Sequence, residues 1–195
     1  MKLKSMICVS LLWSSAVFAV QPRIDQEQPA VDNLGFPLAI GSASHQKLAQ
    51  VFTAGQSGRL THVTAPIACD AAATITIEIQ GVTGTLPNGV VLASETVSGS
   101  TYPPYVAPYS AVPDAGFRLV EFQPPQTVVA GTQYAIVFSA IGDCSMLPAP
   151  AGDFYSAGHA YYDALPNASG WVRLAPPQGP SDDLSFQTFV LVRGK

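Results

Sequence analysis

Residues 127–139 constrain the fold of this chain more than any other stretch: a predicted turn at Ala130-Gly131 joins a short apolar run to a strand with the sequence Gln-Tyr-Ala-Ile-Val-Phe-Ser. In this strand every second residue is large and apolar, namely Tyr134, Ile136 and Phe138, and the residues between them are apolar too. A strand with one wet face alternates apolar with polar residues, whereas a strand covered on both faces does not. The segment therefore predicts a strand buried between two layers.

A clean alternation marks a second strand. In Thr74–Gln80 three isoleucines alternate with four polar residues, which predicts one dry face and one wet face. Asn88-Gly89 then predicts a hairpin turn, because this dipeptide favours the backbone of a two-residue loop. Further strands are predicted from their apolar and β-branched residues at 48–52, 59–67, 90–97, 117–122 and 186–192. Pro124-Pro125 is predicted to end the strand at 117–122.

The overall pattern is that of a β protein. No segment has the period of an amphipathic helix, and 16 glycines and 17 prolines suit a chain with many turns. About eight short strands with such turns predict an all-β fold, an antiparallel β-sandwich of the jelly-roll type.

The first residues have the pattern of an export signal. Lys2 and Lys4 precede an apolar stretch at 6–18 that is too short to span a membrane, and Ala19 supplies a small residue for cleavage. The alternative is a helix that belongs to the core. Polar sequence containing Pro22 follows at once, which favours the signal peptide.

This pattern divides the chain into a signal peptide at 1–19, an N-terminal arm and first strand region at 20–47, and one β-sandwich domain at 48–195. Without Lys2 and Lys4, seven basic residues face thirteen acidic ones, a net charge of −6. No basic cluster remains, which argues against nucleic acid as a partner. No second apolar stretch is long enough for membrane insertion. The sequence predicts a secreted or periplasmic protein.

Two cysteines remain after export, Cys69 and Cys144. In an oxidising compartment they predict a disulfide, for which only one pairing exists. The alternatives are two buried free thiols or half of a metal site.

The motifs of catalysis are weak. The histidines His45, His62 and His159 are far apart in the sequence, so none forms a helical metal-binding pair. The Gly55–Gly58 stretch lacks the spacing of a nucleophile elbow. No catalytic residue is predicted.

Three aspartates are candidate metal ligands. Asp182 and Asp183 precede the last predicted strand, and Asp32 lies in the N-terminal arm. Carboxylates are the ligands that calcium prefers, so a structural calcium ion that joins the two ends of the chain is one hypothesis. The alternative is a pair of solvated aspartates beside a turn. No other cofactor is predicted.

Aromatic residues in loops are the candidate ligand-binding residues, because Tyr and Trp present an apolar face together with a polar group. They are Tyr102, Tyr105, Tyr109, Tyr161, Tyr162 and Trp171. The first three lie in a proline-containing loop at 98–116 that is unusually long for a compact domain. The alternative is that these side chains cover the open ends of the sandwich.

Several segments together resemble a jelly-roll module that is common in secreted bacterial proteins. They are 50–60, 75–79, 87–93, 129–137, 160–162 with 170–171, and 183–189. The match covers most of residues 48–190 and consists mainly of strand and turn signatures. The loop at 98–116 departs from it.

The module is similar in architecture to carbohydrate-binding domains, so the resemblance implies a non-catalytic module that binds a glycan or a cell-surface protein. Two alternatives stay open. One is an extracellular or periplasmic interaction or structural component. The other is a hydrolase whose site assembles only in space.

Overall fold

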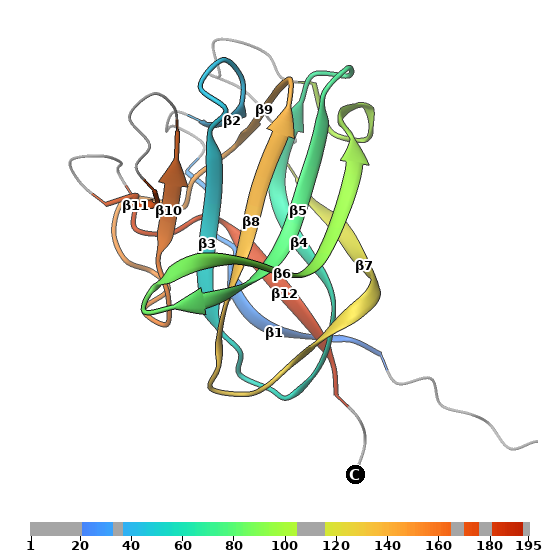
Figure 1. The fold of residues 1–195 in the computed structure, drawn as a ribbon, viewed down its shortest axis with the longest axis vertical. Helices are drawn as coiled ribbons and strands as arrows, with labels where there is room; N and C mark the ends of the chain where they lie inside the picture. Colours follow the sequence, from blue (N-terminus) through green and yellow to red (C-terminus); the bar gives the residue numbers. More distant parts are fainter. Residues whose placement is uncertain (1–20, 33–36, 105–115, 165–169, 176–180, 193–195) are drawn as a thin grey trace, which may run out of the picture.

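The protein consists of two antiparallel β-sheets packed face to face, as the sequence predicts (Figure 1). The computed structural model describes residues 21–32, 37–104, 116–164, 170–175 and 181–192. Within these residues the only helix is the single 3₁₀ turn η1 (Gly99–Thr101). The strands are β1 (Arg23–Gln28), β2 (Leu38–Gly41), β3 (Lys47–Thr53), β4 (Gly58–Cys69), β5 (Thr74–Thr83), β6 (Leu86–Ser98), β7 (Phe117–Val128), β8 (Gln133–Ile141), β9 (Asp143–Met146), β10 (Ala160–Asp163), β11 (Val172–Arg173) and β12 (Phe186–Leu191).

The strand order is that of a jelly roll. The first sheet contains the neighbours β1-β12-β4-β7, and the second contains β3-β8-β5-β6. The chain crosses between the sheets from β3 to β4, from β4 to β5, from β6 to β7 and from β7 to β8. Strand β9 pairs with the end of β4 and with β2, and β10 and β11 extend the second sheet beyond β3.

The core lies between the two sheets. The three alternating isoleucines of β5 point into it and are fully buried, as are Phe52, Phe122 and Phe186. The ring of Phe186 lies 6.5 Å from that of Phe52 and 5.2 Å from that of Tyr155, measured between centroids. Burying one such side chain contributes about 1.5–3 kcal/mol, so this layer is the main source of stability.

Strand β8 is covered on both faces, which confirms the prediction from its sequence. Its inward residues Ile136 and Phe138 belong to the core between the sheets. Its outward residues Ala135 and Val137 belong to a second apolar cluster on the outer face of the second sheet. We call this second group the outer cluster; it comprises Ala49, Val51, Ala135, Val137 and Tyr161, with Val82 and Trp171 packed against it.

A bent hairpin reaches over this outer face. In Figure 1 the green β5–β6 hairpin crosses in front of β8 and β3, and its tip extends toward the loop before β10. The two-residue turn is Gly84-Thr85, because Thr83 pairs with Leu86. The prediction of a turn at Asn88-Gly89 is therefore wrong.

Asn88-Gly89 instead forms a β-bulge in β6, where Gly89 has a φ of +78°. The backbone N–H of Gly89 donates to the side-chain carbonyl of Gln80 at 3.2 Å, and the Asn88 side chain accepts from Val90 N at 2.9 Å. Side chains thus replace part of the regular ladder, and such a bulge increases the local bend. Gly89 has the positive φ that the sequence implies, but the dipeptide bends the hairpin rather than closing it.

The prolines of β7 do not end the strand either. Glu121 pairs with His62 and Gln126 pairs with Leu60, so the residues between Glu121 and Gln126 form a β-bulge. Proline has no N–H to donate to a ladder, and a bulge tolerates this. Strand β7 therefore continues past Pro124-Pro125 to Val128.

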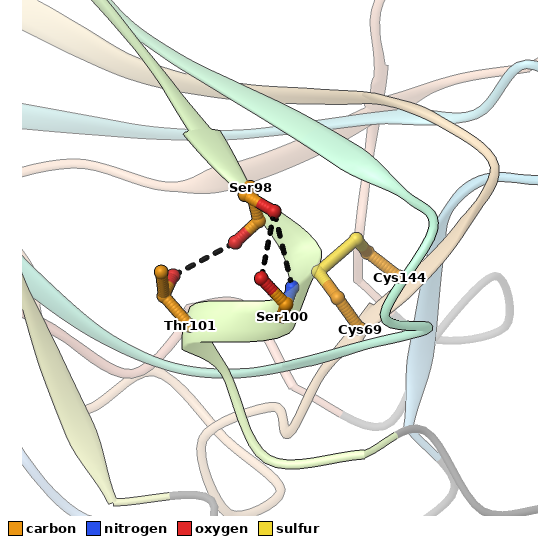
Figure 2. The surroundings of a disulfide bond; sticks show 5 residues. All are labelled: Cys69, Ser98, Ser100, Thr101 and Cys144. Carbon is orange, nitrogen blue, oxygen red and sulfur yellow. Dashed lines mark hydrogen bonds between the residues drawn. A yellow bond between two sulfur atoms is a disulfide. The ribbon is translucent and has the colours of Figure 1, made fainter.

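The predicted disulfide is present. Cys69, the last residue of β4, is bonded to Cys144, which lies directly opposite it on β9. Figure 2 shows the bond next to the η1 turn, which Ser98 holds by accepting from Ser100 N and Thr101 Oγ1. Cys69 N donates to the carbonyl of Pro103, so the start of the 98–116 loop is tied to the same point. Among the described residues no helix is long and apolar enough to cross a membrane.

Candidate functional site

The candidate site is a cavity of about 290 Å³ on the outer face of the second sheet, which we call the hairpin groove. It lies where the end of β3, the start of β8, the tip of the β5–β6 hairpin and the loop before β10 meet. Its lining residues are Val51, Thr53, Thr85, Gln133, Ser156, Ala157, Gly158, His159 and Tyr161.

The wall formed by residues 156–159 is held tightly against β3. Val51 N donates to His159 O at 2.9 Å, and Thr53 Oγ1 donates to Ala157 O at 2.8 Å. A Cβ atom on Gly158 would lie only 1.8 Å from Val51 O, so this approach requires glycine. The wall is therefore a fixed part of the groove.

The groove combines an apolar floor with a polar rim. Val51 and Tyr161 connect it to the outer cluster. The hydroxyls of Thr53, Thr85 and Ser156 and the amide of Gln133 supply groups that both donate and accept hydrogen bonds. The Nδ1 atom of His159 is buried and has no hydrogen-bond partner among the described residues. Among the described residues that line the groove there is no Asp, Glu, Lys or Arg.

A buried carboxylate supports the groove from behind. Asp183 is fully buried, and its Oδ2 accepts from Phe154 N at 3.0 Å and Tyr155 N at 2.9 Å. Its Oδ1 accepts from Gln50 Nε2 at 3.2 Å, and Gln50 Oε1 accepts from Leu184 N at 2.7 Å. Asp183 thereby joins the start of β12 to β3 and to the loop whose next residues form the groove wall.

Burial raises the pKa of Asp183 above its ordinary value of 3.8, because desolvation outweighs the opposing effect of the three N–H donors. Burial also raises the pKa of Asp25, which accepts from Gly55 N. A carboxyl group whose pKa is higher in the folded state binds its proton more tightly there than in the unfolded chain. The stability that its protonation contributes is therefore lost as the pH rises from about 4 through the folded pKa.

We therefore expect the urea midpoint of the protein to fall as the pH rises from about 4 toward neutrality. In Asp183→Asn the side chain cannot titrate, so this decline should be shallower. Urea unfolding of both proteins at several pH values checks this. The same pH slope in the two proteins would contradict the assignment to Asp183.

The structure separates the predicted aromatic residues. Tyr161 is buried on the outer face and lines the groove, and the half-buried Trp171 packs on the same cluster. Tyr162 packs instead toward the core between the sheets, and Tyr102 is buried in that core, which raises its pKa to about 12. Tyr105 and Tyr109 lie outside the described residues, so their predicted role stays a prediction.

The predicted metal ligands have other contacts. Asp182 forms an ion pair with Arg173 at 3.1 Å, and the carboxylate of Asp183 accepts from three N–H donors. Asp32 is half-buried, and its backbone N–H donates to Pro148 O at 2.9 Å. In the part of the chain that the structure describes, no three His, Cys, Asp or Glu side chains gather to hold a metal ion. The calcium site stays a prediction.

Sequence reasoning missed most of the groove. Gln133, Thr85 and Ser156 carry no motif, and His159 was considered only as an isolated histidine. The one signal for this face was the small apolar pair Ala135 and Val137, which requires a cover on the outer side of β8. The sequence does not identify that cover as the distant hairpin and the β10–β11 region.

A second cavity of about 580 Å³ lies between the start of β4 and the end of β7. Of the described residues that line it, Arg59 is the only charged one and none is aromatic. The smaller hairpin groove is the better candidate, because it contains a predicted binding residue, Tyr161, and a rim of neutral polar groups.

No family model matches this chain, and no curated protein matches it either.

Proposed function

We propose that this chain is an exported, non-catalytic binding module that recognises a glycan or another cell-surface ligand through the hairpin groove. The observation that carries the proposal is the pairing of the Tyr161 floor with the neutral polar rim of Thr85, Gln133 and Ser156. A sugar ring has an apolar C–H face and a periphery of hydroxyls, so it needs both kinds of surface. A groove on a strand-supported face also keeps these groups in place before binding.

Export is the second part of the proposal. The disulfide between Cys69 and Cys144 is of the kind that persists in oxidising compartments. Residues 1–19 have the pattern of a signal peptide, and the chain outside them is acidic. Together these features support a secreted or periplasmic location.

The experiment is a glycan array probed with the folded, disulfide-bonded protein and with two double variants. Thr85→Arg/Ala157→Arg fills the groove from two exposed rim positions. Thr83→Arg/Ala151→Arg adds the same charge to the same hairpin and loop at exposed positions outside the groove. We expect about a tenfold or greater loss of binding in the first variant and little change in the second.

Two results would overturn this proposal. One is that the protein binds no glycan on the array although its circular dichroism spectrum shows that it is folded. The other is equal binding by the two variants. A separate Tyr105→Ala/Tyr109→Ala variant tests the loop prediction, because it leaves the buried Tyr102 in place.

A second candidate is a protein-interaction component, and exposed apolar residues on the hairpin favour it. Leu86, Val90 and Val91 of β6 are 38%, 56% and 47% exposed. Exposed apolar residues that cluster on one element often mark a protein contact. This candidate would be favoured if the Thr85→Arg/Ala157→Arg variant still binds cells whereas a Val90→Ser/Val91→Ser variant does not.

A further inference from the structure

We infer that the hairpin groove takes a single neutral pyranose ring and discriminates against charged sugars. The inference rests on the proposed function and narrows its ligand class. It is carried by the size of the groove, by the absence of Asp, Glu, Lys and Arg among the described residues that line it, and by the contacts that already engage Asp182 and Asp183 beside it.

The size of the groove limits the ligand to about one ring. Its volume of about 290 Å³ lies at the lower end of the range of ligand pockets, which extends from about 300 to 1,000 Å³. The hairpin tip with Thr85 stands on one side and the fixed wall at 156–159 on another. A longer saccharide would extend out of the groove, with one unit held inside.

Charged residues near the groove are either engaged by other groups or placed away from it, and His159 is the one described lining residue besides Tyr161 that can titrate. Asp183 lies behind the wall and already accepts from three N–H donors. Asp182 is paired with Arg173. Lys47 lies four residues from Val51 on β3, which is about 13 Å along an extended strand.

A charged sugar would therefore lose water without gaining a partner. Desolvating a carboxylate or an ammonium group is unfavourable unless an opposite charge replaces the water. Removing a neutral hydroxyl from water costs less free energy, because Gln133, Thr85 and Ser156 can each donate a hydrogen bond to it or accept one from it. The hydroxyls of a neutral sugar match this rim.

The test is calorimetric titration of the folded protein at pH 7 in physiological salt. The probes are the methyl glycosides of glucose, galactose and mannose, together with the uronic acid and the amino sugar of each of the three. We expect at least one neutral glycoside to bind about tenfold or more tightly than both of its charged counterparts.

Variants at one position provide the second arm. Gln133→Lys places a cation in the rim and should reduce the preference for the neutral sugar over its uronic acid by about tenfold, while Gln133→Glu should do the same for the amino sugar. Gln126→Lys and Gln126→Glu on β7 are the matched controls, because Gln126 is also half-buried but does not line the groove. These controls should leave both ratios unchanged.

The failures are distinguishable. Equal or tighter binding of a uronic acid or amino sugar overturns the inference on charge and leaves the proposed function standing. Groove-dependent binding of array glycans without binding of any single sugar overturns the inference on size alone. Absence of all glycan binding overturns both the inference and the proposed function.

Discussion

Replacing both Cys69 and Cys144 by alanine should lower the free energy of unfolding by about 4 kcal/mol. The two residues are 75 positions apart, so the bond removes much of the freedom of the unfolded chain. In the chain-entropy account a loop of this length is worth about 4–5 kcal/mol. Both sites are about 1% exposed, and alanine fits them without burying a new polar group.

Urea unfolding of the oxidised protein and of the double alanine variant measures this difference. The control is a thiol reductant, which should destabilise the original protein under unfolding conditions and leave the variant unchanged. A difference below about 1 kcal/mol would mean that the bond between Cys69 and Cys144 restricts the unfolded chain very little.

Asp183→Ala is the substitution with the second largest expected effect, a loss of about 3 kcal/mol in stability. The three N–H donors of Phe154, Tyr155 and Gln50 would lose their common acceptor. Leaving buried donors unpaired costs about 1–3 kcal/mol, and breaking a buried charged network costs more. Because residues 156–159 follow the affected loop directly, groove binding should weaken as well.

Asp182→Ala is the matched control. It removes a carboxylate from the neighbouring position, but its ion pair with Arg173 involves a guanidinium side chain that is 44% exposed. Such pairs contribute about 0–1 kcal/mol. Thermal unfolding of both variants gives the comparison, and equal losses would show that Asp183 has no special role in holding the loop.

The sequence predicts the strands of this fold well where the pattern is local. The alternating isoleucines of β5 and the two-sided apolar pattern of β8 both follow from side-chain direction along a strand. The jelly-roll order could be predicted because it follows from the fold class and strand count. The pairing of Cys69 with Cys144 could be predicted because these are the two cysteines outside the predicted signal peptide.

The two wrong predictions, a hairpin turn and a strand end, both concern positions where side chains determine the local backbone. At Asn88-Gly89 the glycine has the positive φ that the sequence implies, but Gln80 captures its N–H and converts a turn into a bulge. At Pro124-Pro125 the strand bulges instead of ending. In both cases the local sequence allows two outcomes, and the structure has the one that keeps the strand going.

The groove could not be predicted because four separate segments form it. The position of Gln133 is predictable to within a strand, but its neighbours Thr85 and Ser156 reach it only after the hairpin bends and the loop docks. Asp183 was predicted as a calcium ligand from its place before the last strand. Its three N–H donors come from positions 50, 154 and 155, which no local pattern connects with it.

The place of β12 in the first sheet has a consequence for how the chain reaches its native state. This strand is the last of the described strands, yet it lies between β1 and β4. Its pairing with β1 joins residues more than 150 positions apart, and such distant contacts make folding slow. Until β12 arrives, one edge of β4 is unpaired over Arg59–Thr64, so a growing chain cannot finish this sheet from its N-terminus onward. We therefore expect the first sheet to be completed only after β12 has been synthesised.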